Sequence, residues 1–469
     1  MTNPIIKKNS KIGFADALAD KDILFNCFIE KDEVQSIFDK NNNYKFFIIK
    51  GRTGSGKTAL LQYIKKHNED ITHSIDLTNF SMNYIVNSDI FKFLNDIKAD
   101  LSVLFQILWK HVLCLEFIRI KFKIDDENRL NTFIERLTSL FPGKKKYKKQ
   151  KEIATNYIKE WGDNFWQSSD DNVTEVIRGY EDKISAYLKT NVSKFTKAGG
   201  NVAAQISQKE KKEITQRVKK IINGKQLSDL QNLIDITAQA SDKDKIIFFI
   251  LIDNLDTDWS DESIRFRMIR ALLDTLSKFI EIKNLRICVA IRDDILERTL
   301  YETQNISFQR EKIDDFVLDL KWNKNELRDL VETRITYLYK KQYSKENVTF
   351  SDIFCEQIAG KNTFDYLIER TFMRPRDIIV FINECLLAAS NNNSTVITSN
   401  DIKKVAEKEY SRKRLVSVYQ EWSSVYPELQ IIVNYISYKK YKRFPIKSLY
   451  LDDKRFNSFV LELTDEKIK

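Results

Sequence analysis

The chain has 469 residues, more than a single hydrophobic core commonly holds, and this length favours two or three folded units. Apolar residues make up 42% of it and charged residues 31%, proportions that exclude a disordered or fibrous protein. The net charge of +10 fits either a polyanionic partner such as DNA or RNA or a general bias toward lysine. Both interpretations of the charge stay open on composition alone.

Cysteine and histidine usage indicates a reducing compartment. The five cysteines lie far apart, and three stand in apolar runs, which is typical of buried thiols rather than disulfides. With three histidines, we do not expect a histidine-based zinc site. The first ten residues lack the apolar stretch of a signal peptide, and no segment has the apolar length of a membrane span. We therefore expect a cytoplasmic protein without a membrane partner.

The first part of the chain predicts the start of a parallel sheet. Residues 12–39 have helical periodicity and end in a polar turn. Residues 44–50 then contain an unbroken apolar run at 46–49, typical of a strand buried on both faces. A glycine loop and a helix start follow it at once. From residue 89 to residue 240 the apolar spacing is helical, which predicts a long helical insertion.

The sheet is predicted to resume after this insertion. Strands are expected at 246–253, 285–291 and 316–322, with helices at 264–279 and 326–339. This alternation predicts an α/β fold with a parallel sheet core. Helices are then expected at 350–359, 364–371, 375–390 and 399–421.

The predicted organisation has five parts. They are a lead-in with the start of the ATPase core (1–88), the helical insertion (89–240), the rest of the core (241–342), a helical lid (343–420) and a small helical or winged-helix module (421–469). Basic runs at 144–151 and 209–212 in the insertion suggest solvated loops or, alternatively, a nucleic-acid patch.

Residues 51–58 match the Walker A phosphate-loop pattern GxxxxGK[ST]. They read Gly51-Arg52-Thr53-Gly54-Ser55-Gly56-Lys57-Thr58. Glycines let the backbone curl so that successive amides point at a phosphate, and the following helix adds its positive N-terminal end. Lys57 is expected to reach the β- and γ-phosphates, and the Thr58 hydroxyl to complete the Mg²⁺ shell. The cofactors predicted are ATP and Mg²⁺, since no guanine-reading motif stands out.

The strand at 246–253 ends in Asp253, the expected Walker B carboxylate on the Mg²⁺ side. The next residue, Asn254, cannot accept a proton from water. Asp256 is the nearest carboxylate in sequence that could serve as general base, and a turn or helix-capping role is its alternative. Slow hydrolysis therefore remains open.

Arg292 follows the strand at 285–291, at the edge where open α/β sheets bind ligands. It is expected to sense or stabilise the γ-phosphate, and an ordinary pair with a neighbouring aspartate is the alternative. Arg310 is a candidate arginine finger for the nucleotide of a neighbouring subunit.

Arg374 and Arg376 flank Pro375 at a predicted helix start, where positive charge opposes the helix dipole. An anionic group is expected to compensate. A nucleotide phosphate is one candidate, and Asp377 or Glu369 could do so structurally.

The order of these motifs resembles the AAA+-related ATPases of the STAND, KAP and origin-recognition type. More closely, the lead-in at 12–17, the phosphate loop, the Asp-Asn-Leu-Asp segment with Trp259 and the Arg-Pro-Arg-Asp helix resemble a bacterial P-loop ATPase family found beside defence and mobile-element genes. The resemblance covers most of residues 12–420. It implies that Arg374 or Arg376 senses the nucleotide from a helical lid. Asn254 stands where AAA+ enzymes usually have a catalytic glutamate, a departure that argues for slow turnover.

We expect from this resemblance an ATP-driven, homo-oligomeric switch of prokaryotic antiphage defence. It would control a separate effector protein, because no nuclease, deaminase or other effector domain is recognisable in the chain. The alternatives are a DNA-associated AAA+-type loader or remodeller and a nucleotide-binding scaffold with little hydrolysis. Salt-dependent retention on DNA would distinguish the loader, and turnover would distinguish the scaffold.

Overall fold

The computed structural model describes residues 5–39, 44–75, 77, 89–97, 99–122, 157, 207–218, 224–241, 246–257, 259–303, 311–342, 347–422, 426–437 and 445. Contacts along the chain divide it into two units. The sheet unit comprises Asp16–Glu326, and the helical unit comprises Met1–Ala15 with Leu327–Lys469. The division falls inside helix α16 (Lys324–Gln342). The sequence analysis had placed all of these residues in one predicted part, the rest of the ATPase core at 241–342.

Within the described residues, the sheet unit contains a five-stranded, all-parallel sheet in the order β2-β3-β4-β1-β5. The strands are β1 (Phe46–Gly51), β2 (Thr72–Ile75), β3 (Phe248–Ile252), β4 (Leu285–Arg292) and β5 (Val317–Asp319). This sheet with its helices confirms the predicted α/β class. Strand β2 was not predicted, because its sequence Thr-His-Ser-Ile has no apolar run and three of its four residues are only partly buried at the sheet edge.

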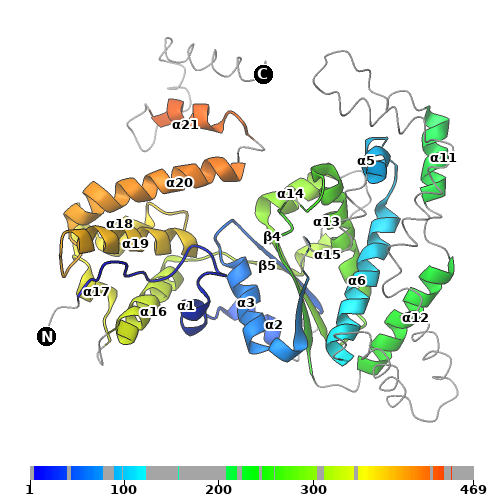
Figure 1. Ribbon diagram of the computed structural model, residues 1–469, viewed down its shortest axis with the longest axis horizontal. Helices are drawn as coiled ribbons and strands as arrows, with labels where there is room; N and C mark the ends of the chain where they lie inside the picture. The colour runs from blue at the N-terminus through cyan, green and yellow to red at the C-terminus, as the bar shows by residue number, and fades with distance from the viewer. Residues whose placement is uncertain are drawn as a thin grey trace. The chain divides into compact units, whose positions relative to one another are not determined.

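Helices cover both faces of the sheet, because alternate residues of each buried strand point to opposite sides. Phe46, Ile48 and Ile250 belong to the larger core, which includes buried residues of α6 and α13. Phe47 and Ile49 belong to a second core with α2 and α3. Figure 1 shows α2 and α3 on one side of the strands and α6 and α13 on the other.

The helices of the sheet unit follow in chain order. They are α1 (Lys21–Asn26), α2 (Asp32–Phe38), α3 (Lys57–His67), α5 (Asp89–Asp96), α6 (Ser102–Phe122), α11 (Gln208–Val218), α12 (Gly224–Ser241), α13 (Glu262–Leu276), α14 (Asp293–Glu302) and α15 (Glu311–Asp314), with 3-10 turns η1 (Glu69–Ile71) and η3 (Ser277–Phe279). The described parts of the predicted insertion are helical. Its basic run at 144–151 lies outside the described residues, whereas the run at 209–212 lies on α11.

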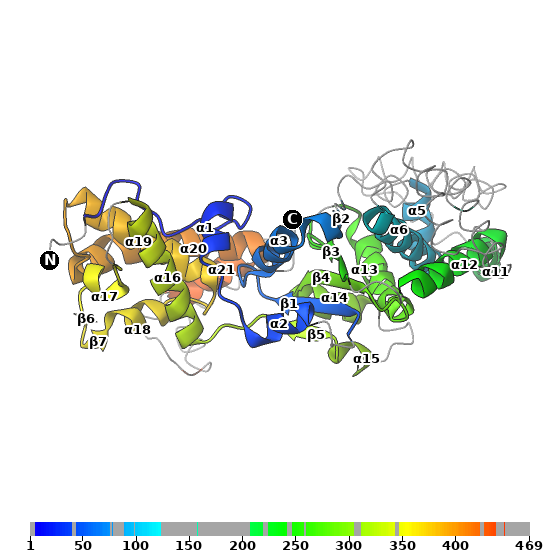
Figure 2. The ribbon, with the colours of Figure 1, turned by 90° about the horizontal axis from the view of Figure 1, so that it is seen from below.

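The helical unit is built from α16 and the elements after it. They are α17 (Phe350–Ile353), β6 (Gln357–Ile358), β7 (Lys361–Asn362), α18 (Thr363–Ile368), α19 (Pro375–Asn391), the π-helix η4 (Asp401–Ala406), α20 (Glu407–Trp422) and α21 (Leu429–Ser437). Figure 2 shows the β6–β7 hairpin beside α17 and α18. The prediction of a helix over 350–359 is wrong beyond Ile353, because Phe354 has an extended backbone and forms a β-bridge with Ile397. The β6–β7 hairpin follows and turns at Ala359 and Gly360, which take positive φ angles of 52° and 75°.

The N-terminal segment of the helical unit is held through its backbone. The Asn383 amide donates to the Gly13 carbonyl at 2.8 Å and accepts from the Ile12 amide at 3.0 Å. Arg334 donates to the Ile12 carbonyl at 3.0 Å. Residues 12–15, quoted above for a family resemblance, therefore pack with α16 and α19.

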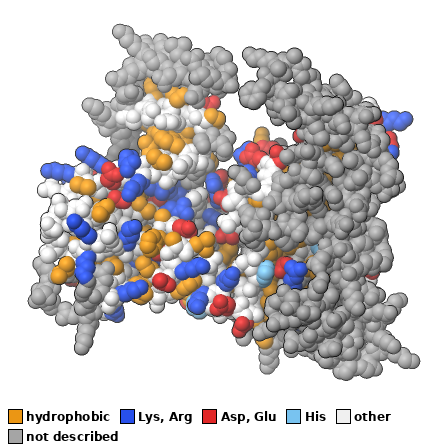
Figure 3. Space-filling model, in the orientation of Figure 1, with side chains coloured by type: hydrophobic (Ala, Val, Ile, Leu, Met, Phe, Trp, Pro, Cys, Tyr) orange, Lys and Arg blue, Asp and Glu red, His pale blue; other side chains and the backbone are white. Residues whose placement is uncertain are grey.

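Three further predictions concern the whole chain. Four of the five cysteines, all free, are buried, and Cys355 is partly buried. No described helix is both long and apolar enough to cross a membrane. On the face drawn in Figure 3, Lys and Arg side chains are interspersed with acidic and hydrophobic ones.

The predicted winged-helix module lies mostly outside the described residues, which include α21.

Candidate functional site at the carboxyl edge of the sheet

The phosphate loop connects β1 to α3, as the sequence predicts. Gly51 ends β1, and a Cβ atom there would stand 2.5 Å from the Ser55 hydroxyl oxygen, so only glycine fits. Gly54 and Gly56 have φ angles of 80° and 102°, in the left-handed region that favours glycine. The tight curl that a phosphate requires thus depends on three glycines with separate steric reasons.

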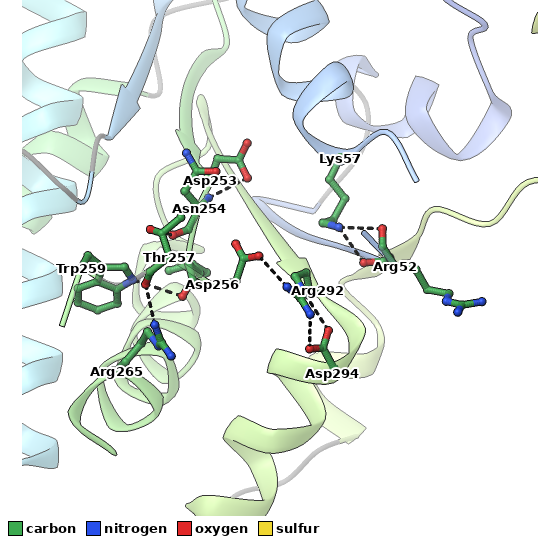
Figure 4. A network of polar contacts seen from close by, with 12 residues as sticks. Arg52, Lys57, Asp253, Asn254, Asp256, Thr257, Trp259, Arg265, Arg292 and Asp294 are labelled. Atoms are coloured by element: carbon green, nitrogen blue, oxygen red, sulfur yellow. Dashed lines mark hydrogen bonds and ion pairs between the residues drawn. The ribbon is translucent and has the colours of Figure 1, made fainter. Parts of the chain in front are cut away.

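Lys57 lies at the start of α3, and its ammonium group folds back over the loop. It donates to the Gly51 carbonyl at 2.8 Å and to the Arg52 carbonyl at 3.1 Å, as Figure 4 shows for Arg52. Burial lowers the pKa of Lys57, while Asp256 and Asp253 nearby act in the opposite direction. The charged amine is therefore partly desolvated, and its hydrogen-bond acceptors among the described residues are the two loop carbonyls, which a phosphate oxygen would replace.

The side chains of Thr58 and Asp253 are in contact, although β1, which leads into the phosphate loop, and β3, which ends just before Asp253, are not neighbours in the sheet. Strand β4 lies between β1 and β3, yet the Thr58 hydroxyl donates to Asp253 Oδ2 at 2.8 Å. The other carboxylate oxygen accepts from the Asn254 backbone amide at 2.8 Å. Burial raises the pKa of Asp253, and these two hydrogen bonds oppose the shift. The structure thus brings together the two predicted Mg²⁺-side residues.

This pair of oxygen donors fits Mg²⁺. The ion is commonly held by one or two carboxylates together with water and substrate phosphates. Within the described ranges, no three His, Cys, Asp or Glu side chains gather as a closed metal site. The hydroxyl of Thr58 and the carboxylate of Asp253, at the end of the phosphate loop, would suit an ion that arrives with a nucleotide.

A fixed turn follows Asp253 and explains why residue 254 is asparagine. Asn254 has φ of 60°, and among residues with a side chain asparagine tolerates this left-handed conformation best. Its carbonyl accepts from the Thr257 amide at 3.2 Å and the Thr257 hydroxyl at 2.8 Å. Arg265 donates to the Thr257 carbonyl at 2.7 Å. A glutamate at position 254 would be strained in this turn, because its side chain is disfavoured at a φ of 60°.

The same turn directs Asp256 toward Arg292. Arg292 Nη1 lies 3.3 Å from Asp256 Oδ2, while its Nε and Nη2 bind the two oxygens of Asp294 at 2.9 and 2.7 Å. Figure 4 shows the guanidinium between the two carboxylates. Arg292 pairs in register with Gly51, the first residue of the phosphate loop. The predicted base and the predicted γ-phosphate sensor are therefore bonded to each other at the edge of the site.

Trp322 is a supporting residue that the sequence analysis missed. It follows β5, and its indole N–H donates to the Ser55 carbonyl of the phosphate loop at 2.7 Å. The Lys31 ammonium lies 5.1 Å from the centre of the Trp322 ring and donates to the Lys321 carbonyl and to Glu326. A polar aromatic residue at the end of a parallel strand was the available signal, since all parallel strands end at the same edge.

Arg374 and Arg376 lie in the helical unit, at the start of α19. Arg374 is buried and binds Asp377 through Nε at 2.9 Å and Nη2 at 3.2 Å. Asp377 is thus the compensating carboxylate, whereas Glu369 pairs with Lys361. Arg376 donates to the Ala15 carbonyl at 3.1 Å. Arg310 lies outside the described residues.

Part of the chain is similar to a described domain family. Residues 325–419 match the family of the FunZ-associated C-terminal helical domain. The match begins at α16 and ends in α20, so it covers most of the described helical unit. The sheet unit that carries the phosphate loop lies outside this match.

Two curated proteins are distant relatives. A protein of Escherichia coli K12 described as the putative transposon gamma-delta 80.3 kDa protein is 22% identical over 437 residues, 92% of this chain and 54% of its own length. The allergen Alt a 2 of Alternaria alternata is 26% identical over 122 residues, 26% of this chain and 64% of its own length. Each relative is thus matched over less than two thirds of its own length. No solved structure matches the chain significantly.

Proposed function

We propose that the chain binds ATP with Mg²⁺ at the carboxyl edge of the sheet and hydrolyses it. One observation carries the proposal: the Thr58 hydroxyl, beside the glycine loop, meets the Asp253 carboxylate at 2.8 Å across an intervening strand. An ordinary turn between a strand and a helix has no need of this convergence. The loop amides, Lys57 and the start of α3 supply positive potential for the phosphates.

Each residue has a chemical task in this proposal. Lys57 neutralises charge on the β- and γ-phosphates after leaving the loop carbonyls. Bound Mg²⁺ would supply further charge neutralisation at Thr58 and Asp253. Arg292 stabilises negative charge on the γ-phosphate, and Asp256 accepts a proton from the attacking water. Trp322 keeps the loop in its binding conformation.

We further propose that the ATPase works as a homo-oligomeric switch of prokaryotic defence that controls a separate effector. The description of the Escherichia coli relative as a transposon protein supports a place among defence or mobile-element genes. The cytoplasmic location, the lid function of the helical unit and nucleotide sensing by Arg374 or Arg376 belong to the same proposal.

Phosphate release from the purified protein with ATP and Mg²⁺ tests the enzymatic part. Lys57→Ala and Asp253→Ala are each expected to reduce turnover by about 10²-fold or more, since each removes a preorganised charge from the transition state. Lys65→Ala is the control, because Lys65 is an exposed lysine in the last turn of the same helix α3. Light scattering with and without nucleotide tests assembly. Turnover that survives both substitutions would refute the proposed site.

A DNA-associated loader is a second candidate, favoured by the transposon description of the relative. It predicts retention on duplex DNA that falls steeply as salt rises, because phosphate contacts release counterions. ATP turnover with no DNA binding at low salt would exclude this candidate and leave the switch.

A further inference from the structure

Two ion pairs of Arg292, with Asp294 and with Asp256, are unequal. Asp294 binds the guanidinium through two parallel hydrogen bonds at 2.9 and 2.7 Å, the strong bidentate arrangement. Asp256 contributes a single contact at 3.3 Å, and its side chain is 33% exposed against 22% for Asp294. Asp294 is also only two residues from Arg292, at the start of α14. If one partner exchanges, it is Asp256.

The backbone around Asp256 has little freedom to follow such an exchange. Leu255 and Trp259 are buried on either side of it, and the Trp259 indole donates to the Leu255 carbonyl at 3.3 Å. Arg265, itself buried, holds the Thr257 carbonyl. Asp294 holds the planar Arg292 guanidinium at Nε and Nη2, so the part able to move is the Asp256 side chain, by rotation about its Cα–Cβ bond.

We propose that the Arg292–Asp256 pair is a latch that a nucleoside triphosphate opens, a step that rests on the proposed function. The γ-phosphate carries more negative charge than a carboxylate, so it competes for Arg292 Nη1, while Asp294 retains Nε and Nη2. A diphosphate lacks this group and leaves the latch closed. Arg292 is thereby the residue that distinguishes triphosphate from diphosphate.

Opening the latch frees the carboxylate that the reaction needs. The oxygen of a water molecule forms a bond to the γ-phosphorus, and the bond from that phosphorus to the β–γ bridging oxygen breaks. The water proton passes to Asp256, and the bridging electron pair leaves with the diphosphate. Asp256 in the closed latch is occupied by Arg292, so hydrolysis is suppressed until the γ-phosphate is in place.

The test compares two matched changes from acid to amide on the same arginine, Asp256→Asn and Asp294→Asn. Calorimetry measures the affinity for Mg²⁺–ADP and for a non-hydrolysable ATP analogue with Mg²⁺, and single-turnover assays measure phosphate release. Asp256→Asn is expected to tighten analogue binding about threefold to tenfold, to leave ADP binding unchanged and to slow phosphate release about 10²-fold or more. Asp294→Asn is expected to keep phosphate release within about tenfold of the wild type, since the base remains.

Arg292→Ala supplies the opposite arm. It is expected to weaken analogue binding about tenfold or more without changing ADP binding, because only the γ-phosphate contact is lost. Unchanged analogue affinity and phosphate release in Asp256→Asn, in a wild type whose turnover depends on Lys57, would overturn the latch alone. If the wild type binds nucleotide without hydrolysing it, the analogue and ADP affinities of the variants decide whether the latch exists. If the wild type binds no nucleotide, both the proposed function and the latch are refuted.

Discussion

Two arginines at helix starts, Arg292 in the sheet unit and Arg374 in the helical unit, have opposite environments. Both precede a first helical turn that contains their aspartate partner. The side chain of Arg292 is 16% exposed and binds two partly exposed carboxylates, those of Asp256 and Asp294. The side chain of Arg374 is 4% exposed, and its partner Asp377 is fully buried and also binds Arg414 at 3.1 Å.

This contrast indicates which of the two ion pairs is able to exchange its partner. Near the surface an ion pair costs little to break, so Arg292 is able to exchange Asp256 for an incoming anion. In the interior, a broken pair leaves a charge without compensation, at a cost of several kcal/mol. We therefore infer that Arg374 stabilises the start of α19 and that its motif, Arg-Pro-Arg-Asp, has a structural role whatever it contributes to nucleotide sensing.

Removal of Asp377 should give the largest effect on stability. Asp377→Ala leaves Arg374 and Arg414 buried without their shared carboxylate and should destabilise the helical unit by about 3–5 kcal/mol. Urea unfolding followed by circular dichroism measures the change. Asp294→Ala is the matched control at Arg292 and should cost less, about 1–2 kcal/mol, because this bidentate pair is partly exposed to water. Equal losses for the two variants would contradict the contrast between the arginines.

Loss of the Trp322 hydrogen bond should give the next largest effect, on nucleotide affinity. Trp322→Phe keeps an aromatic ring but removes the donor to the Ser55 carbonyl, worth about 1 kcal/mol, so binding should weaken about fivefold. Calorimetric titration with Mg²⁺–ADP checks this. Trp109→Phe removes a similar bond, to the Met268 carbonyl at 2.9 Å, away from the phosphate loop. An equal loss of affinity in both variants would show that Trp322 acts only through general stability.

Asn254 tests whether the turn that directs Asp256 depends on its left-handed backbone. Asn254→Gly should leave stability nearly unchanged, whereas Asn254→Ala and Asn254→Glu should each cost about 1 kcal/mol, because a Cβ atom is disfavoured at φ of 60°. Thermal unfolding gives the ranking. Faster phosphate release in Asn254→Glu would contradict the assignment of the base to Asp256, since it would place a working base at position 254.

The smallest effect expected is a pH-dependent gain in stability on neutralising Asp253. Burial raises its pKa, so the folded protein holds the proton more tightly than the unfolded chain. Its destabilising contribution is therefore absent below the unfolded pKa, grows as pH rises and is complete above the folded pKa. Asp253→Asn should raise the melting temperature of the nucleotide-free protein at neutral pH by about a few degrees, and the gain should disappear in acid. A gain that is independent of pH would exclude this cause.

Local sequence patterns were sufficient to predict several elements of this fold. Unbroken apolar runs predicted β1, β3 and β4, because strands buried on both faces need apolar side chains at every position. The glycine loop was equally visible, since few other residues tolerate its backbone. Strand β2 and the β6–β7 hairpin were missed, because a half-exposed edge strand and a two-residue ladder leave no such pattern.

The pairing of the charged residues, by contrast, could be read only from the tertiary structure. Asp256 and Arg292 are 36 residues apart in the chain, and Thr58 and Asp253 are 195 apart. Arg374 also had two candidate carboxylates in the sequence. Which oppositely charged groups meet depends on strand order and on the direction of each turn, because electrostatic pairing is set by distance in space rather than by spacing in sequence. The order β3-β4-β1 thus places Arg292 between the phosphate loop and Asp256.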